Sequence, residues 1–97
     1  MSSLTIPVTL AQRALRSDDA LFQEVGGEAV LLDLASERYF GLDPIGTRIW
    51  TLLADHDSLQ AVADVLHTEY DAEPERISSD LLRLVGQLAE AGLVKLA

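Results

Sequence analysis

Short apolar runs separated by polar turns fill residues 20–42, a pattern typical of β-strands. Leu21–Val25 is followed by Gly26-Gly27 and then by the apolar run Ala29–Leu34. A Gly-Gly pair between two such runs indicates a two-residue hairpin, because both loop positions need a positive φ. A third run, Arg38–Leu42, comes after a polar turn that contains no glycine. These residues predict a three-stranded antiparallel meander.

Three helical segments are expected directly after the strands. The first begins with Asp43 as N-cap and Pro44 in the first turn, and it runs to about Asp55. The second begins at Asp57 or Ser58, and the third extends from near Pro74 to a glycine stop at position 92. The apolar positions at helical spacing are Ile45, Ile49, Leu52 and Leu53, then Leu59, Val62, Ala63 and Leu66, then Ile77, Leu81, Leu84, Val85 and Leu88.

Strands followed by helices with short connections predict an α+β domain. The 97 residues suffice for one such domain with a modest core. We expect residues 1–17 to form an extended N-terminal arm, in which Pro7 limits any strand to a sheet edge. Residues 18–97 would form the domain itself, and Leu93–Leu96 would add a short terminal strand.

The third predicted strand leads straight into a helix, so no later strand of the meander covers its outer edge. An uncovered strand edge can bind an extended peptide. The third helix also has more apolar surface than one stripe needs, because Leu81 and Leu82 are adjacent, as are Leu84 and Val85. Part of that surface would face a groove beside the strand. The alternative is a central helix that its neighbours bury on two sides.

Charge narrows the range of partners. Sixteen acidic against seven basic residues give a formal charge of −9, which opposes binding to nucleic acid or to an anionic membrane surface. The chain has no cysteine, no basic and apolar signal sequence, and no apolar run of the roughly 20 residues that a membrane span needs. We therefore expect a cytoplasmic protein without nucleic-acid or membrane partners.

Two other functions remain open. The last two helices could form a helix-turn-helix and make the protein an acidic winged-helix transcriptional regulator, although Glu73, Glu75, Asp80 and Glu90 outnumber the basic side chains of the third helix. Asp57-Ser58-Leu59 resembles the attachment site of acyl or peptidyl carrier proteins, with Ser58 as the modified residue. A helix cap at Ser58 explains the same residues more simply.

We expect neither catalytic activity nor a bound metal or other cofactor. His56 and His67 are not at a metal-ligand spacing, and no nucleophile with a matching base or phosphate-binding loop is evident.

Phe40 and Trp50 are most simply core residues. Gly86 lies inside the third helix, where glycine costs about 1 kcal/mol relative to alanine. Close approach of another backbone would explain why this position is glycine. A surface position where glycine is merely tolerated would explain it equally well.

The sequence resembles the PqqD-like family, also called the RiPP recognition element, over residues 20–96. It is most similar to the free-standing leader-binding proteins of split lasso-peptide systems. The resemblance rests on the order and spacing of several short motifs. They are Leu31-Leu32-Asp33, Tyr39-Phe40-Gly41-Leu42, Gly46-Thr47-Arg48-Ile49-Trp50, Glu69-Tyr70-Asp71, Asp80-Leu81-Leu82 with Leu88, and Gly92-Leu93. The family commonly has Asn where this chain has Asp43, and both residues cap helices.

The resemblance implies a winged-helix-like domain with a three-stranded antiparallel sheet followed by three helices. It also implies that the leader segment of a ribosomally made precursor peptide binds as an added strand along the third strand, beside the third helix. The implied enzyme partners are a cysteine-protease-like leader peptidase and an ATP-dependent macrolactam cyclase, or a radical enzyme. The peptide-binding residues expected on this basis are Arg38, Tyr39, Phe40, Gly41, Leu42, Ile77, Asp80, Leu81, Arg83, Leu84, Gln87 and Leu88.

Overall fold

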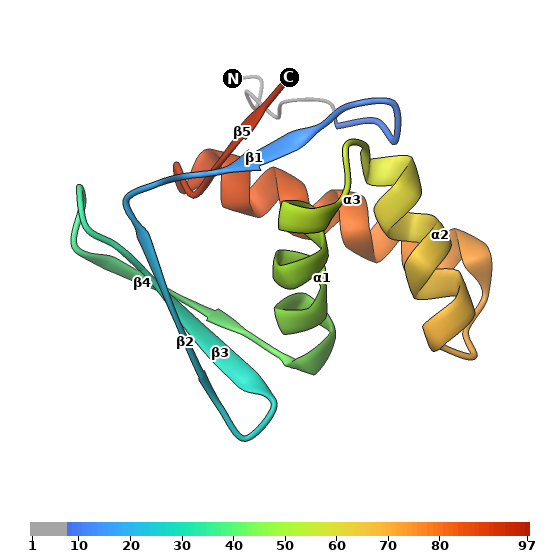
Figure 1. Cartoon of the computed structure of the whole chain (residues 1–97), viewed down its shortest axis with the longest axis horizontal. Coiled ribbons are helices and arrows are strands. Elements are labelled where there is room, and N and C mark those ends of the chain that lie inside the picture. The colour runs from blue at the N-terminus through green and yellow to red at the C-terminus, as the bar shows by residue number, and fades with distance from the viewer. Residues whose placement is uncertain (1–7) are drawn as a thin grey trace, which may run out of the picture.

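The computed structural model describes residues 8–97 (Figure 1). Over that range its elements are β1 (Ala14–Arg16), β2 (Ala20–Val25), β3 (Glu28–Asp33), β4 (Arg38–Leu42), α1 (Pro44–Asp55), α2 (Leu59–Glu69), α3 (Pro74–Glu90) and β5 (Val94–Leu96). A three-stranded sheet followed by three helices confirms the predicted α+β architecture. Residues 1–7 of the predicted arm, including Pro7, lie outside the described range.

The sheet is the predicted antiparallel meander, in the order β2-β3-β4. Gly26 and Gly27 join β2 to β3 with φ values of 65° and 87°, which confirms the two-residue hairpin. The turn from β3 to β4 contains no glycine, and the side chain of Asp33 stabilises it. The carboxylate of Asp33 accepts hydrogen bonds from the Ala35 amide at 3.2 Å and the Ser36 hydroxyl at 2.7 Å.

The first and last strands of the described range pair with each other. β1 and β5 form a two-stranded antiparallel sheet, seen at the top of Figure 1, so the predicted terminal strand at residues 93–96 is present. Ala14 is buried, and the carbonyls of Leu10 and Gln12 accept hydrogen bonds from the first amides of α2 at 2.9 and 2.8 Å. From residue 8 onward, the expected extended arm is therefore part of the folded domain.

The helix boundaries follow their capping residues. The Asp43 carboxylate accepts a hydrogen bond from the Gly46 amide at 2.7 Å, and the Ser58 hydroxyl accepts one from Ala61 at 3.1 Å. The sequence left Asp57 and Ser58 as alternative caps for the second helix, and the structure shows that Ser58 is the N-cap of α2. α3 ends just before Gly92, whose φ of 77° terminates it. Within residues 8–97, no helix has the length and apolar character that a bilayer span requires.

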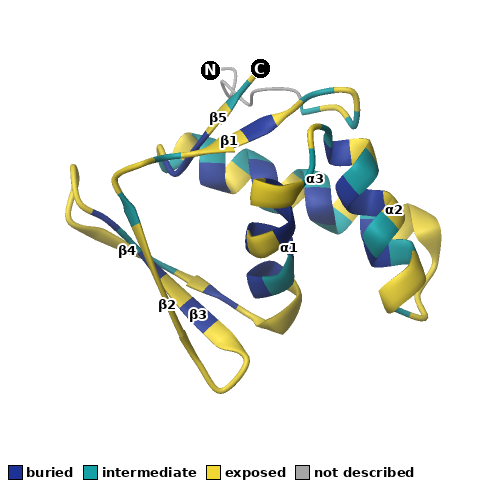
Figure 2. Ribbon diagram, viewed as in Figure 1, coloured by how far each residue is buried: buried dark blue, intermediate teal, exposed yellow. Residues whose placement is uncertain are grey.

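The hydrophobic core surrounds α1, which stands between the sheet and the α2–α3 pair (Figures 1 and 2). Trp50 is buried, as predicted, and the guanidinium of Arg16 lies 5.1 Å from the centre of its ring. Phe40 differs from the prediction because it is only half-buried against the core. Phe40 lies in the middle of β4 and lines the cavity described below.

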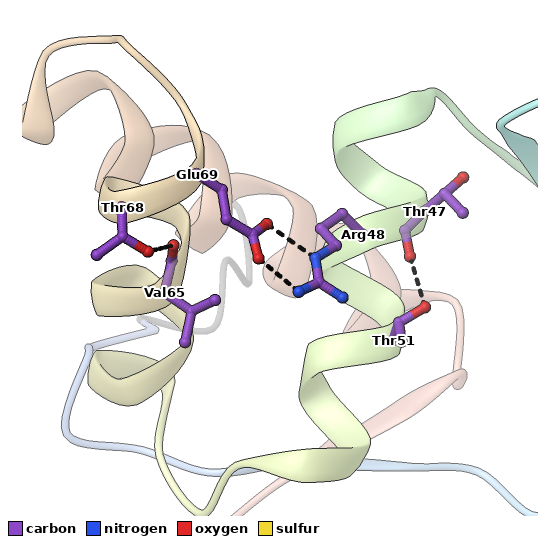
Figure 3. A network of polar contacts seen from close by, with 6 residues as sticks. All are labelled: Thr47, Arg48, Thr51, Val65, Thr68 and Glu69. Carbon is purple, nitrogen blue, oxygen red and sulfur yellow. Dashed lines mark hydrogen bonds and ion pairs between the residues drawn. The ribbon is translucent and has the colours of Figure 1, made fainter.

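An ion pair joins α1 to α2. Arg48 donates two hydrogen bonds to the Glu69 carboxylate, one of them from Nε to Oε1 at 2.8 Å (Figure 3). The hydrogen bond from Arg48 holds the pKa of Glu69 below its usual value, and the same bond raises the pKa of Arg48. The paired geometry fixes the relative positions of two helices that border the candidate site.

Candidate functional site

The outer edge of β4 is open: among residues 8–97, β4 has β3 on one side and no strand on the other. The Leu34 amide bonds to the carbonyl of Asp19, so alternate residues of β3 point toward β2 and toward β4. With Leu31 opposite Phe40 in the register, the same alternation directs the N–H and C=O groups of Tyr39 and Gly41 to the open edge. These groups can pair with one further strand.

A cavity of about 330 Å³ lies beside this edge, between β4, the start of α1 and α3. We call it the β4–α3 groove. Its walls combine apolar side chains with charged and amide side chains, a composition that suits a peptide with alternating apolar and polar residues. The lining residues are Phe40, Gly41, Leu42, Asp43, Ile45, Gly46, Ile49, Asp80, Arg83, Leu84 and Gln87.

A second cavity, of about 290 Å³, adjoins the groove and is more apolar. The two cavities share Ile45, Ile49 and Asp80. The second continues between α1, the end of α2 and the start of α3, where Leu66, Tyr70, Asp71, Ala72, Arg76 and Ile77 complete it. A ligand in the groove could thus extend one or more apolar side chains into a neighbouring pocket.

Asp80 is the main charged group on the wall between the cavities. Its Oδ1 accepts a hydrogen bond from Nη2 of Arg83 at 3.0 Å, and Nε of Arg76 lies 3.9 Å from its Oδ2. The two arginines remain largely exposed. They can therefore change partner at low cost when an acidic ligand arrives, because exposed ion pairs contribute at most about 1 kcal/mol.

The structure brings together many of the residues that the sequence proposed for the site. Phe40, Gly41, Leu42, Asp80, Arg83, Leu84 and Gln87 line the groove, and Ile77 lines the second cavity. Arg38 and Tyr39 are exposed on β4 and line neither cavity. Leu81 and Leu88, which were also expected among the peptide-binding residues, are fully buried and line neither cavity. Helical periodicity puts Leu81, Leu84 and Leu88 on one side of α3, where Leu81 and Leu88 are buried in the core and Leu84 lies at the edge that borders the groove.

Sequence reasoning missed the contribution of α1. Ile45 and Ile49 were assigned to the core stripe of that helix, yet both line the groove, and Ile45 is 42% exposed. Asp43, predicted only as a helix cap, and Gly46, named only within a family motif, lie there as well. The available signal was the direct passage from strand to helix, which forces the first turn of α1 next to the end of β4.

Gly86 does not line the groove. A methyl group on Gly86 would lie 3.8 Å from Cγ2 of Val8, in ordinary van der Waals contact. The glycine therefore lies near Val8, and it lines neither cavity. Among residues 8–97, no backbone atom from outside α3 lies within 4 Å of the position that a methyl group on Gly86 would occupy.

Comparison with known proteins identifies the family. The family model described as coenzyme PQQ synthesis protein D (PqqD) matches residues 28–94. The chain belongs to the PqqD family. The match covers β3, β4 and all three helices, and the matched range contains every residue that lines the groove.

A curated relative and two solved structures resemble the PqqD-family chain. The bifunctional coenzyme PQQ synthesis protein C/D of Methylorubrum extorquens is 35% identical over 69 residues, which are 71% of this chain and 18% of that protein. The chain thus spans about a fifth of that relative.

Both solved structures are complexes with a leader peptide. The structure of TbiB1 in complex with the TbiA(beta) leader peptide has a TM-score of 0.77 and 32% identity, and covers 84% of this chain and 94% of TbiB1. Lasso peptide synthetase B1 complexed with the leader peptide has a TM-score of 0.76 and 28% identity. This second match covers 86% of this chain and 98% of the synthetase B1 chain. The two proteins have the same fold as this PqqD-family member.

Proposed function

We propose that this protein binds the leader segment of a ribosomally synthesised precursor peptide and presents the peptide to modifying enzymes. The observation that carries the proposal is the open edge of β4 facing α3 across the groove. The two solved structures of similar fold support it, because each holds a leader peptide. The role is that of an adaptor, with no catalytic step and no cofactor.

The leader would bind by strand addition. The N–H and C=O groups of Tyr39 and Gly41 would form hydrogen bonds with its main chain, which provides affinity for any extended sequence. Selectivity would come from its side chains, because alternate residues of the leader point into the groove toward Phe40 and Leu84. Arg83 and Asp80 at the rim would select charged leader residues.

The partners we propose follow from the lasso-peptide neighbours. They are a cysteine-protease-like leader peptidase and an ATP-dependent macrolactam cyclase. A radical enzyme would replace them if the protein serves a pathway closer to that of the PQQ relative. Both alternatives use the same groove, since each needs the leader held while the core of the precursor stays accessible.

Calorimetry combined with hydrogen exchange tests the proposal. A cognate leader peptide of 10–20 residues should bind without metal or nucleotide, with a dissociation constant between about 10 nM and 10 μM, since ordering a flexible peptide costs roughly 2–5 kcal/mol. The amide hydrogens of Tyr39 and Gly41 should become protected from exchange. Binding without protection at these amides would contradict strand addition on β4, and absence of binding at high micromolar concentration would contradict the function.

A further inference from the structure

β2 forms a second open edge, on the opposite side of the same sheet. Among the described residues, β3 pairs with one side of β2 and no strand covers the other. The exposed fractions of Leu21, Phe22 and Val25 are 54%, 39% and 73%, so the strand is accessible along its length. An accessible six-residue edge strand without proline or lysine is one that natural proteins usually protect unless it has a partner.

Backbone alternation identifies the groups available on that edge. The carbonyl of Asp19 accepts a hydrogen bond from Leu34, so odd-numbered residues of β2 face β3. The N–H and C=O groups of Phe22 and Glu24 therefore point outward, whereas the amide of Ala20 is bonded to the Ser17 carbonyl. Phe22 and Glu24 are successive outward-facing residues, so they can form a short ladder of hydrogen bonds with an added strand.

The charge around β2 indicates what kind of strand would bind. Residues 17–33 contain no lysine or arginine. Asp18, Asp19, Glu24 and Glu28 are all exposed along or beside the strand. The β4 edge differs, since Arg38 and Arg83 lie near it. A second copy of this chain, with its charge of −9, would be repelled by the acidic edge, whereas a basic segment would be attracted.

We propose that the β2 edge is a second strand-addition site, which takes a basic, extended segment of a partner protein. Apolar residues of that segment would extend the outward sheet face beside Leu21 and Val25, and its basic residues would lie on the other face near Glu24. If the leader occupies β4, as proposed above, the two added strands are four strand spacings apart, or roughly 19 Å. The β2 edge would then hold an enzyme close to the peptide that it processes.

A designed peptide tests the site without knowledge of the partner. The peptide is acetyl-Lys-Val-Lys-Val-Lys-Val-Lys-amide, and its matched control has Glu in place of every Lys. In NMR titrations the basic peptide should shift and protect the amides of Phe22 and Glu24, and it should do so equally when a leader peptide is bound at β4. Shifts confined to Tyr39 and Gly41, or equal binding of the acidic control, would overturn the proposal.

Two variants complete the experiment. Glu24→Lys should weaken binding of the basic peptide by up to about fivefold and strengthen that of the acidic control, because one exposed ion pair is worth at most about 1 kcal/mol. Phe22→Pro should abolish binding, since it removes an outward N–H that the sheet does not use. Ultracentrifugation of the protein alone should show monomers. A dimer with β2 amides already protected would instead assign the edge to a second copy. Loss of leader binding alone would contradict the proposed function and leave the β2 result standing.

Discussion

Arg83 donates a hydrogen bond to Asp80 one turn earlier on α3, with 3.0 Å between Nη2 and Oδ1, and both side chains line the β4–α3 groove. The pair is exposed, so it adds little to stability. Its position at the rim gives it another use. An acidic leader residue would compete with Asp80 for the guanidinium, and a basic one would compete with Arg83 for the carboxylate.

Removing the guanidinium should change leader binding in a salt-dependent way. For Arg83→Ala we expect the affinity for an acidic leader to fall about two- to fivefold at low salt, and the difference to shrink as salt is added. Calorimetry at two ionic strengths measures both effects. Arg13→Ala is the matched control, because Arg13 pairs with Asp57 and does not line the groove. An equal loss in the control would indicate an effect of net charge alone.

Substitutions of two half-buried leucines of α3 can distinguish an effect on leader binding from an effect on packing. Leu84 lines the groove, whereas Leu82 lies beside Ser78 and Ser79 on another side of the helix. We expect Leu84→Ala to weaken leader binding about five- to thirtyfold, equivalent to about 1–2 kcal/mol of lost apolar contact. Leu82→Ala should leave binding unchanged. Urea unfolding of both variants checks that their stabilities are similar, and equal affinities would remove Leu84 from the peptide contact.

Gly86 and Gly92 should respond in opposite ways to alanine. Gly86 is helical and has room for a methyl group, so Gly86→Ala should raise the free energy of unfolding by up to about 1 kcal/mol. Gly92 has a φ of 77°, so Gly92→Ala should lower that free energy by about 1 kcal/mol. Thermal melts measure both changes. Leader affinity should stay the same in each variant, and a loss of affinity in Gly86→Ala would place that residue near the peptide.

The Arg48–Glu69 pair should make stability depend on pH. The hydrogen bond from Arg48 lowers the pKa of Glu69 in the folded state, so the folded protein favours the ionised carboxylate. This contribution is complete above the pKa of the unfolded chain, near 4.5, and is lost as the pH falls through the lower folded value. Glu69→Gln should therefore be less stable than the native protein at pH 7 and equally stable near pH 2. Urea titrations at both values test this, and a difference independent of pH would contradict it.

The local pattern of the sequence determined the elements. Gly26-Gly27 specified the hairpin because its backbone needs positive φ at both positions, and Asp43 and Ser58 specified helix starts because their side chains satisfy amides that have no partner within the helix. The open edge of β4 was also predictable, since the strand runs directly into α1. These features depend on neighbours within a few residues of each other in the chain.

The tertiary structure decided which side chains meet. The sequence could not distinguish Leu84, in the groove, from Leu81 and Leu88, in the core, because apolar periodicity gives the width of a helix face but not what packs against each part of it. Ile45 lies in the groove because residues of α3, distant in the sequence, complete a cavity with the end of β4 and the first turn of α1. Likewise, a methyl group on Gly86 would meet the side chain of Val8, 78 positions away in the chain, a proximity that no local pattern encodes.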